Sequence, residues 1–289
     1  MSMVVLVVLV FVVLLVLSLG GVLAFADYRW RAKTADLIAQ LGGNGFVSSS
    51  AAFSAAEIAG LPTPATRYFR AVLRDGQLIV RRVRLSQQGD FLLRPAQNGW
   101  RPFTATQYIA VQRAGFVWDA RIRMAPGLAV RVRDAFVDGT GYMLASLMGI
   151  VRLASVEATP GIAAGALHRY LAEAVWCPTA LLPSQGVVWT PIDDSIARAS
   201  LSVAGTTVSL DFRFGRDSLV QSVFTPERAR DVDGRAVPTP WQGRFSDYEE
   251  HDGMLIPLSG EVEWLLPEGP QVYWRGRITE VSHEYQERE

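Results

Sequence analysis

An uninterrupted apolar run opens the chain. Residues Val4 to Phe25 carry no charge, and as a helix they extend about 33 Å at about 1.5 Å per residue. That length matches the roughly 30 Å hydrocarbon layer of a bilayer. Tyr28-Arg29-Trp30-Arg31 follows directly, and its aromatic and guanidinium groups suit the headgroup region. We therefore predict a transmembrane anchor over residues 1–26.

Two features of this anchor leave alternatives open. Ala24-Phe25-Ala26 has the small-x-small form that signal peptidase cleaves, so a removed signal peptide is one alternative. Arg29, Arg31 and Lys33 follow the span, and the positive-inside rule then favours a body in the cytoplasm.

Residues 27–76 are predicted to be a helical linker that ends in short helices. The first helix is expected to stop at Gly42-Gly43-Asn44-Gly45, since glycine and asparagine tolerate positive φ. Thr63-Pro64 then combines a capping residue with a proline at the first helical position. This pair predicts one short helix, and Ser54 with Glu57 as a capping box predicts another before it.

The hydrophobic period changes to two after residue 77. Apolar and polar residues alternate over Phe116 to Met124 and Leu128 to Val132, on either side of the turn Ala125-Pro126-Gly127, which predicts an antiparallel hairpin. Tyr142 to Val156 is predicted to be one long strand that bends at Gly149.

One helix, at 160–176, interrupts the strands and begins with the cap-and-proline pair Thr159-Pro160. Its apolar stripe is expected to face the core. Its opposite stripe is expected to face solvent and consists of His168, Arg169 and Glu173.

The predicted fold is mainly β: a curved antiparallel sheet or half-barrel of about ten or eleven strands with a covering helix, preceded by the transmembrane helix. Residues 77–289 form a single antiparallel β-domain in this prediction, with the helix 160–176 inserted between two groups of strands. A sheet of this width curls, and helices then cover its concave face.

Charge is unevenly distributed, although the net charge is zero. Residues 27–154 carry 17 basic and 8 acidic side chains, whereas residues 155–289 carry 11 basic and 20 acidic ones. Attraction between the two halves within one fold explains this pattern most simply. The alternative is that the basic half faces anionic lipid.

No catalytic or metal-binding motif is recognisable. His168, His251 and His283 lack metal-ligand spacing, and the lone Cys177 is expected to be a buried small hydrophobe. Phosphate loops, nucleophile elbows and nucleotide fingerprints do not occur. We expect no enzyme activity, no cofactor, no metal and no nucleic-acid partner.

A hydrolase is the least favoured alternative. Asp193-Asp194 is one pair of acids that hydrolysis could use, but a solvated turn explains it. An acidic patch around a second turn consists of Asp247, Glu249, Glu250 and Asp252.

Two sets of residues are candidates for ligand contact. Inward-facing aromatic residues are expected to line a cavity, or else to pack an ordinary core: Phe116, Trp118, Tyr170, Trp176, Trp264 and Trp274. Four arginines on one face of the predicted hairpin are expected to meet lipid phosphates, or else solvent: Arg121, Arg123, Arg131 and Arg133.

Three stretches, Arg169 to Pro183, Gly243 to Tyr248 and Tyr273 to Ile278, resemble an uncharacterised bacterial family of membrane-anchored proteins. The resemblance covers nearly the whole body. It implies a single-pass protein of the inner membrane with an extracytoplasmic body, and it implies no particular activity.

The order of strands, helix and strands is also similar to that of periplasmic lipoprotein carriers and their outer-membrane receptors. That similarity implies acyl-chain binding in a half-barrel, with the helix from Pro160 to Trp176 as a lid.

The sequence thus predicts a membrane-tethered, non-catalytic protein that binds a lipid or another hydrophobic ligand in a half-barrel cavity. An envelope interaction scaffold is the alternative, with a closed interior and an outer face that docks another envelope protein. A cavity of a few hundred Å³ discriminates between the two.

Overall fold

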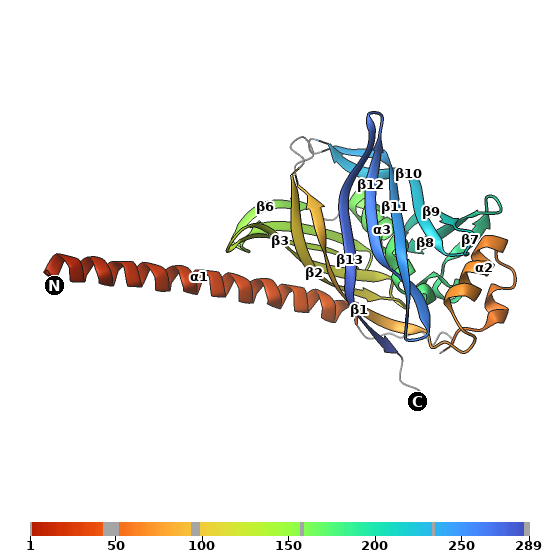
Figure 1. Ribbon diagram of the computed structural model, residues 1–289, viewed down its shortest axis with the longest axis horizontal. Coiled ribbons are helices and arrows are strands. Elements are labelled where there is room, and N and C mark those ends of the chain that lie inside the picture. The colour runs from red at the N-terminus through yellow and green to blue at the C-terminus, as the bar shows by residue number, and fades with distance from the viewer. Residues whose placement is uncertain (1, 43–51, 94–98, 157–158, 233–234, 286–289) are drawn as a thin grey trace.

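Alternating apolar and polar residues build one antiparallel sheet of 13 strands, in the order β6-β5-β4-β3-β2-β1-β13-β12-β11-β10-β9-β8-β7. The structure is a computed structural model that describes residues 2–42, 52–93, 99–156, 159–232 and 235–285. The sheet curls into a half-barrel (Figure 1). Its strands are β1 (Val80–Leu92), β2 (Trp100–Ala110), β3 (Gly115–Ala125), β4 (Leu128–Val137), β5 (Thr140–Leu147), β6 (Val151–Val156), β7 (Val188–Pro191), β8 (Ile196–Val203), β9 (Thr206–Phe214), β10 (Val220–Val232), β11 (Arg235–His251), β12 (Met254–Leu266) and β13 (Gly269–Tyr285).

The predicted fold class is confirmed, but the predicted number of strands was too low. Part of the difference lies at Tyr142 to Val156, where the predicted single strand is in fact β5 and β6. Met148 and Gly149 have φ angles of 56° and 77°. These left-handed conformations reverse the chain instead of bending it, and β6 pairs back onto β5.

The helices are α1 (Met3–Leu41), α2 (Thr63–Val72) and α3 (Pro160–Glu173), with short 3₁₀ helices η1 (Ala55–Ile58), η3 (Ala174–Trp176), η4 (Pro178–Leu181) and η5 (Pro183–Gln185). The predicted helix at 160–176 is therefore α3 followed by η3. The Thr159 hydroxyl caps α3 by accepting a hydrogen bond from the Ile162 amide at 3.3 Å. Gly42 caps α1, and the rest of the predicted stop, residues 43–45, lies outside the described residues.

The covering helix α3 bridges the two groups of strands. It contacts β3, β4 and β5 on one side and β9 and β10 on the other, so it closes the open side of the curled sheet. The oppositely charged halves of the sequence also meet in space, because β1 pairs with β13. Among the described residues, four ion pairs join these halves: Arg74–Glu250 at 2.9 Å, Arg82–Glu284 at 3.6 Å, Arg169–Asp134 at 2.6 Å and Arg275–Asp90 at 3.1 Å.

One end of the half-barrel is filled by aromatic side chains. Tyr68 and Phe69 of α2 are fully buried there. Their rings lie 5.6 Å from the ring of Phe214 and 5.9 Å from that of Trp189, respectively. Trp189 in turn lies 5.1 Å from Phe212. Rings at these separations attract one another beyond simple burial, so this end is a solid core.

The helix α1 docks on the outer face of β3 and β4. Its last turns bury Leu37 and Leu41 against alanine and valine side chains of β2, β3 and β4. About two turns before Leu37, the indole of Trp30 donates hydrogen bonds at 3.0 and 2.9 Å to the carboxylate of Asp119. The Thr34 hydroxyl donates to the same carboxylate at 2.6 Å. Trp30 is therefore buried against protein, although its sequence context suggested the headgroup region.

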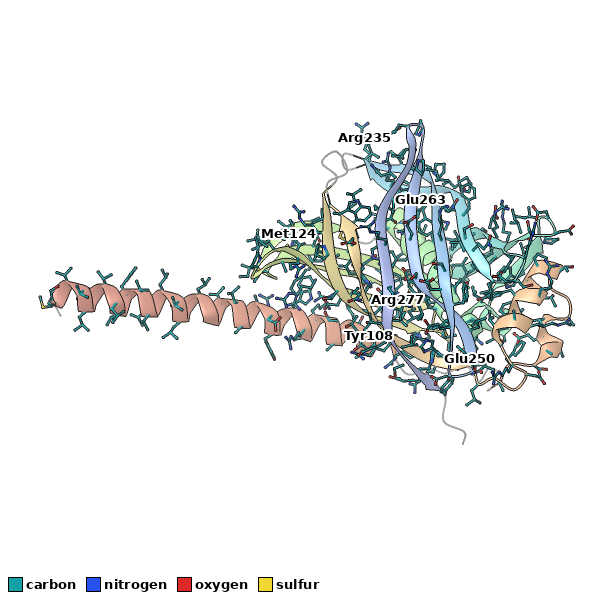
Figure 2. All side chains as sticks on the ribbon, in the orientation of Figure 1. Tyr108, Met124, Arg235, Glu250, Glu263 and Arg277 are labelled. Carbon is teal, nitrogen blue, oxygen red and sulfur yellow. The ribbon has the colours of Figure 1, made fainter. Side chains whose placement is uncertain are left out.

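The N-terminal part of α1 stands apart from the body. Its apolar side chains project into open space (Figure 2), and none of the most apolar 18-residue window is buried. By length and composition, this helix can cross a membrane.

A row of glycines crosses the centre of the sheet, where Gly89 pairs with Gly276 and Gly276 with Gly260. The ring of Trp274 occupies the space that side chains at Gly276 and Gly260 would need: a Cβ on Gly276 would lie 2.5 Å from Cζ2 of this ring, and a Cβ on Gly260 would lie 3.4 Å from its Cζ3. The glycines therefore let a buried indole lie flat on the sheet.

We expect Gly276→Ala to lower the free energy of unfolding by about 1–3 kcal/mol, since the buried ring must shift. Gly165→Ala is the control, because its Cβ would meet nothing within 4 Å and alanine suits a helix better. Guanidinium unfolding followed by tryptophan fluorescence measures both. Equal stability of the two variants would contradict the packing described for Trp274.

Candidate ligand-binding cavity

A cavity of about 720 Å³ lies under α3, inside the curled sheet. Side chains from both groups of strands form its wall, which is mostly apolar. The aromatic and aliphatic lining consists of Phe91, Leu93, Trp118, Ile122, Met124, Val130, Val132, Met143, Ala145, Leu153, Ala229, Trp241, Val262, Trp264, Tyr273 and Trp274.

Strand alternation explains this lining. In β3 and β4, Trp118, Ile122, Val130 and Val132 point into the cavity, while the alternate residues Asp119, Arg121 and Arg131 point to the outer face. The filled aromatic core lies near β8 and β9, and the cavity lies between β3 to β6 and the facing ends of β1 and β10 to β13. The half-barrel is thus hollow at one end only.

The six aromatic residues proposed from the sequence do not all share this cavity. Trp118, Trp264 and Trp274 line it. Phe116, Tyr170 and Trp176 are buried elsewhere in the core, with exposed fractions of 0%, 2% and 2%. The ligand contacts proposed for these six residues remain predictions.

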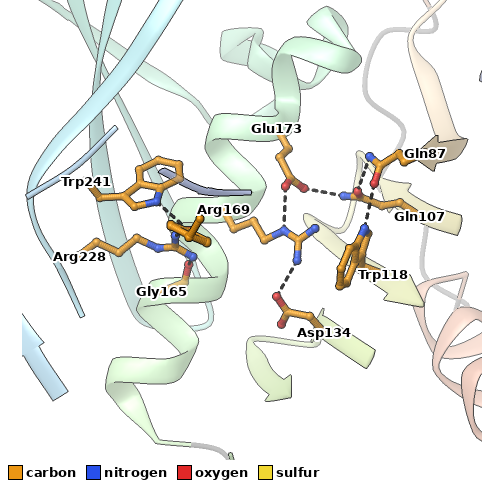
Figure 3. A network of polar contacts seen from close by, with 10 residues as sticks. Gln87, Gln107, Trp118, Asp134, Gly165, Arg169, Glu173, Arg228 and Trp241 are labelled. Carbon is orange, nitrogen blue, oxygen red and sulfur yellow. Dashed lines mark hydrogen bonds and ion pairs between the residues drawn. The ribbon is translucent and has the colours of Figure 1, made fainter. Parts of the chain in front are cut away.

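A chain of polar contacts runs from α3 into the cavity wall (Figure 3). Arg169 donates from Nη1 to Asp134 at 2.6 Å and from Nε to Glu173 at 2.8 Å. Gln107 donates to the second oxygen of Glu173 at 2.6 Å. Gln87 then donates to Gln107 at 3.1 Å and accepts from the indole of Trp118 at 2.8 Å. The network ties α3 to four strands.

Burial by itself would lower the pKa of Arg169, but the adjacent Glu173 and Asp134 carboxylates outweigh this effect and raise it. The guanidinium carbon also lies 4.8 Å from the ring centre of Phe116 and 5.0 Å from that of Trp118. Arg169 therefore stays charged, and its charge is balanced within the protein.

We expect Arg169→Met to lower the free energy of unfolding by about 3–5 kcal/mol, since Asp134 and Glu173 would lose their counter-charge inside the protein. Arg198→Met is the control: its pair with Asp211 is at the surface, so the expected loss is below about 1 kcal/mol. Guanidinium unfolding measures both losses. Similar values for the two variants would rule out a stabilising role for the buried network.

Arg228 is a second arginine in the cavity wall, and it is held differently. It donates from Nη1 to the Tyr273 hydroxyl and from Nη2 to the Gly165 carbonyl of α3, both at 3.1 Å. Its guanidinium carbon lies 4.6 Å from the ring centre of Trp241 and 5.7 Å from that of Trp264. Figure 3 shows Arg228 beside Trp241 and Gly165.

A β-bulge directs Arg228 inward. Thr225 pairs with Trp241, but Arg228 pairs with Thr239, so β10 holds one residue more than β11 between these pairs. Strict alternation from Thr225 would direct Glu227 into the interior. The bulge replaces an inward acid with an inward base.

His168 lies on the buried side of α3, so the predicted exposure of the polar stripe was wrong. Only 8% of His168 is exposed, and its Nδ1 is buried with no hydrogen-bond partner among the described residues. Burial, and secondarily the charge of Arg228, lower the pKa of His168 to about 4. The imidazole is therefore neutral at physiological pH.

This shift predicts a pH dependence of stability. Between about pH 6.5 and about pH 4, the unfolded chain binds a proton at His168 that the folded protein does not. Stability is complete above this window, and about 3 kcal/mol is lost as the pH falls through it. His168→Gln should remove this component in unfolding titrations from pH 7 to 4. An unchanged slope in the variant would show that His168 is not responsible.

The four arginines proposed for lipid headgroups divide into two pairs. Arg131 and Arg133 contact α1: Arg131 pairs with Asp27, and Arg133 donates to the Trp30 carbonyl at 2.6 Å. Arg121 and Arg123 are exposed and line a broad, open hollow of about 1310 Å³ on the outer face of the sheet. Within the described part of the chain, neither of this second pair has an acidic partner.

The acidic residues considered for hydrolysis lie at the surface. Asp193 accepts hydrogen bonds from the amide and hydroxyl of Ser195, as in an ordinary turn. Those of the acidic patch pair with basic residues: Asp247 and Glu249 with Arg277, Glu250 with Arg74, and Asp252 with His283. No group of three or more potential metal ligands occurs among the residues described. Cys177 is fully buried, and burial raises the pKa of its thiol to about 12.

Sequence reasoning missed Arg169, Glu173 and Arg228 as parts of the cavity. A signal for the first two was present, because α3 is apolar nearly all round and such helices are buried on more than one side. Arg228 gave no comparable signal, since the bulge that turns it inward depends on pairing with β11.

The structure is thus an antiparallel half-barrel with one covering helix and an apolar cavity between sheet and helix. Residues 59–283 match DUF6920, a family of unknown function, and the chain belongs to this family. The resemblance to an uncharacterised family is thereby confirmed. No curated protein matches the sequence.

Solved structures show distant likenesses. A domain of an outer membrane lipoprotein-sorting protein from Vibrio parahaemolyticus is 7% identical, with 70% of this chain and 85% of that chain covered and a TM-score of 0.40. A LolA superfamily protein from Nitrosomonas europaea is 12% identical, with coverages of 77% and 94% and a TM-score of 0.35. A β-barrel-like protein of family DUF1849 from Brucella abortus is also 12% identical, with coverages of 71% and 98% and a TM-score of 0.20. These scores are too low to carry conclusions about function.

Proposed function

We propose that this protein is a membrane-tethered, non-catalytic binding protein that holds a lipid or another hydrophobic ligand in the cavity under α3. The observation that carries the proposal is the apolar cavity of about 720 Å³. Its volume is within the roughly 300–1,000 Å³ range of ligand pockets. A large apolar wall gains free energy when a ligand removes it from water.

The polar groups of the wall are compatible with such a ligand. Arg169 is balanced by Asp134 and Glu173, and behind the wall Gln87 and Gln107 bond to each other and to the wall residues Trp118 and Glu173. These groups therefore stabilise the position of α3 without needing water or a ligand as a partner. The scaffold alternative requires a closed interior, so the cavity favours binding.

The tether in this proposal is α1. The backbone of Ala26, at the end of the apolar run, packs against Gly149 in the β5–β6 turn. Large apolar side chains are exposed at this turn and at the β3–β4 turn: Leu128, Ile150, Val151 and Leu153. Such exposure is expected where a body contacts a bilayer surface.

The nearby Arg121 and Arg123 then suit lipid phosphates, whereas Arg131 and Arg133 serve the contact with α1. The location that we propose is the inner membrane with an extracytoplasmic body, as the family resemblance implies. The partners in this proposal are the bilayer and the lipid or acyl ligand, with an envelope protein as a further partner.

Filling the cavity tests the proposal. Ala145 lines the cavity, so Ala145→Trp places an indole where the ligand would lie. The full chain, extracted in a mild non-ionic detergent, should carry an apolar adduct in native mass spectrometry, and this variant should reduce the bound fraction at least about tenfold. Ala71→Trp on the exposed face of α2 is the matched control and should leave the adduct unchanged.

Two outcomes would contradict the proposal: an adduct that survives Ala145→Trp in a folded protein, or wild-type protein that never retains an added fatty acid or alcohol. Tryptophan fluorescence during unfolding verifies that the variant is folded.

A further inference from the structure

We propose that the cavity selects ligands with one acidic head group, a carboxylate or a phosphate, on an apolar body, and that Arg228 binds this group. The inference rests on the proposed function, because it assigns a ligand chemistry to the same cavity. It depends on the charge, the unused donors and the surroundings of Arg228.

The charge of Arg228 is not balanced as that of Arg169 is. Arg169 has two carboxylate partners, at 2.6 and 2.8 Å. Both hydrogen bonds of Arg228 go to neutral oxygens, those of Tyr273 and Gly165. Among the described side chains, no carboxylate pairs with Arg228. A half-buried cation in an apolar wall is costly without a counter-charge, and an anionic ligand supplies one.

Hydrogen-bond donors also remain unused at this point of the wall. The Nε of Arg228 is buried and has no acceptor among the described residues. The Tyr273 oxygen accepts from Arg228 at 3.1 Å and from the Trp241 indole at 2.9 Å, so both of its lone pairs are occupied. Toward a ligand, the Tyr273 hydroxyl can therefore act only as a hydrogen-bond donor. An arginine N–H and a tyrosine O–H together match the acceptor oxygens of a carboxylate or phosphate.

The surroundings require that this acid be part of an apolar molecule. Trp241 and Trp264 flank the guanidinium, and Tyr273 stacks on Trp264 with ring centres 5.8 Å apart. Beyond this aromatic group the wall continues through aliphatic side chains such as Val262. A small hydrophilic anion would leave that surface uncovered, whereas an acyl or alkyl chain covers it.

A competition experiment tests this selectivity. The full chain in non-ionic detergent is mixed with equal amounts of hexadecanoic acid, hexadecyl phosphate and hexadecanol, and native mass spectrometry gives the three adducts. We expect wild type to favour at least one acid over the alcohol by about tenfold or more, the usual effect of a charge-assisted hydrogen bond. The favoured acid identifies the head group.

Arg228→Gln should bring the acid-to-alcohol ratio close to one while the alcohol adduct persists. Tyr273→Phe should lower the ratio severalfold. Arg235→Gln removes the same charge at an exposed position of the same hairpin and should preserve the wild-type ratio. If Arg228 has only a structural role, Arg228→Gln would reduce all three adducts by the same factor. This result would overturn the inference.

Equal binding of the three probes by wild type, or an unchanged ratio in Arg228→Gln, would also overturn it and leave the proposed function intact. If wild type shows none of the three adducts, the proposed function and this inference are both contradicted.

Discussion

A single curled sheet can bury its concave face only against whatever lies across from it, and here one helix is the main cover. The strands β11 and β13 have 17 residues each, or roughly 55 Å when extended. The helix α3 has 14 residues, or roughly 21 Å. Since α3 is too short to cover such a sheet, one end is filled by α2 and the other stays hollow. The cavity is therefore a consequence of the fold's proportions.

The helix α3 packs into the apolar core on one side, and charged side chains hold it where it borders the cavity. Arg169 connects α3 to Asp134 on β4, and Arg228 on β10 reaches back to the Gly165 carbonyl of α3. Both arginines lie against aromatic rings, which keep the guanidinium groups in place at the apolar wall. Arg169 has its counter-charge within the chain. Arg228 does not, and this difference separates a structural cation from one suited to a ligand.

The sequence predicted those elements that depend on neighbouring residues alone, such as alternating strands and capped helices. The alternation at Phe116 to Met124 gives β3, and Thr159-Pro160 starts α3 as predicted. Partners distant in the sequence could not be predicted in this way. Trp30 was expected at lipid headgroups, but it is buried because Asp119, 89 residues away, accepts its indole hydrogen bonds. Arg169 was likewise expected in solvent, because the sequence around it gives no sign of Asp134 or of the cavity.

The hairpin of β3 and β4 takes part in both proposed roles, attachment through α1 and ligand binding in the cavity. Adjacent residues serve opposite faces: Trp118 lines the cavity while Asp119 holds Trp30 of α1, and Val132 lines the cavity while Arg133 bonds to the same helix. The helix α1 and the cavity therefore lie on opposite sides of one pair of strands, only a sheet's thickness apart. Because α1 is docked by buried side chains, this hairpin fixes the direction of α1 relative to the cavity, and a displacement of β3 and β4 on the cavity side would act directly on the surface that holds α1.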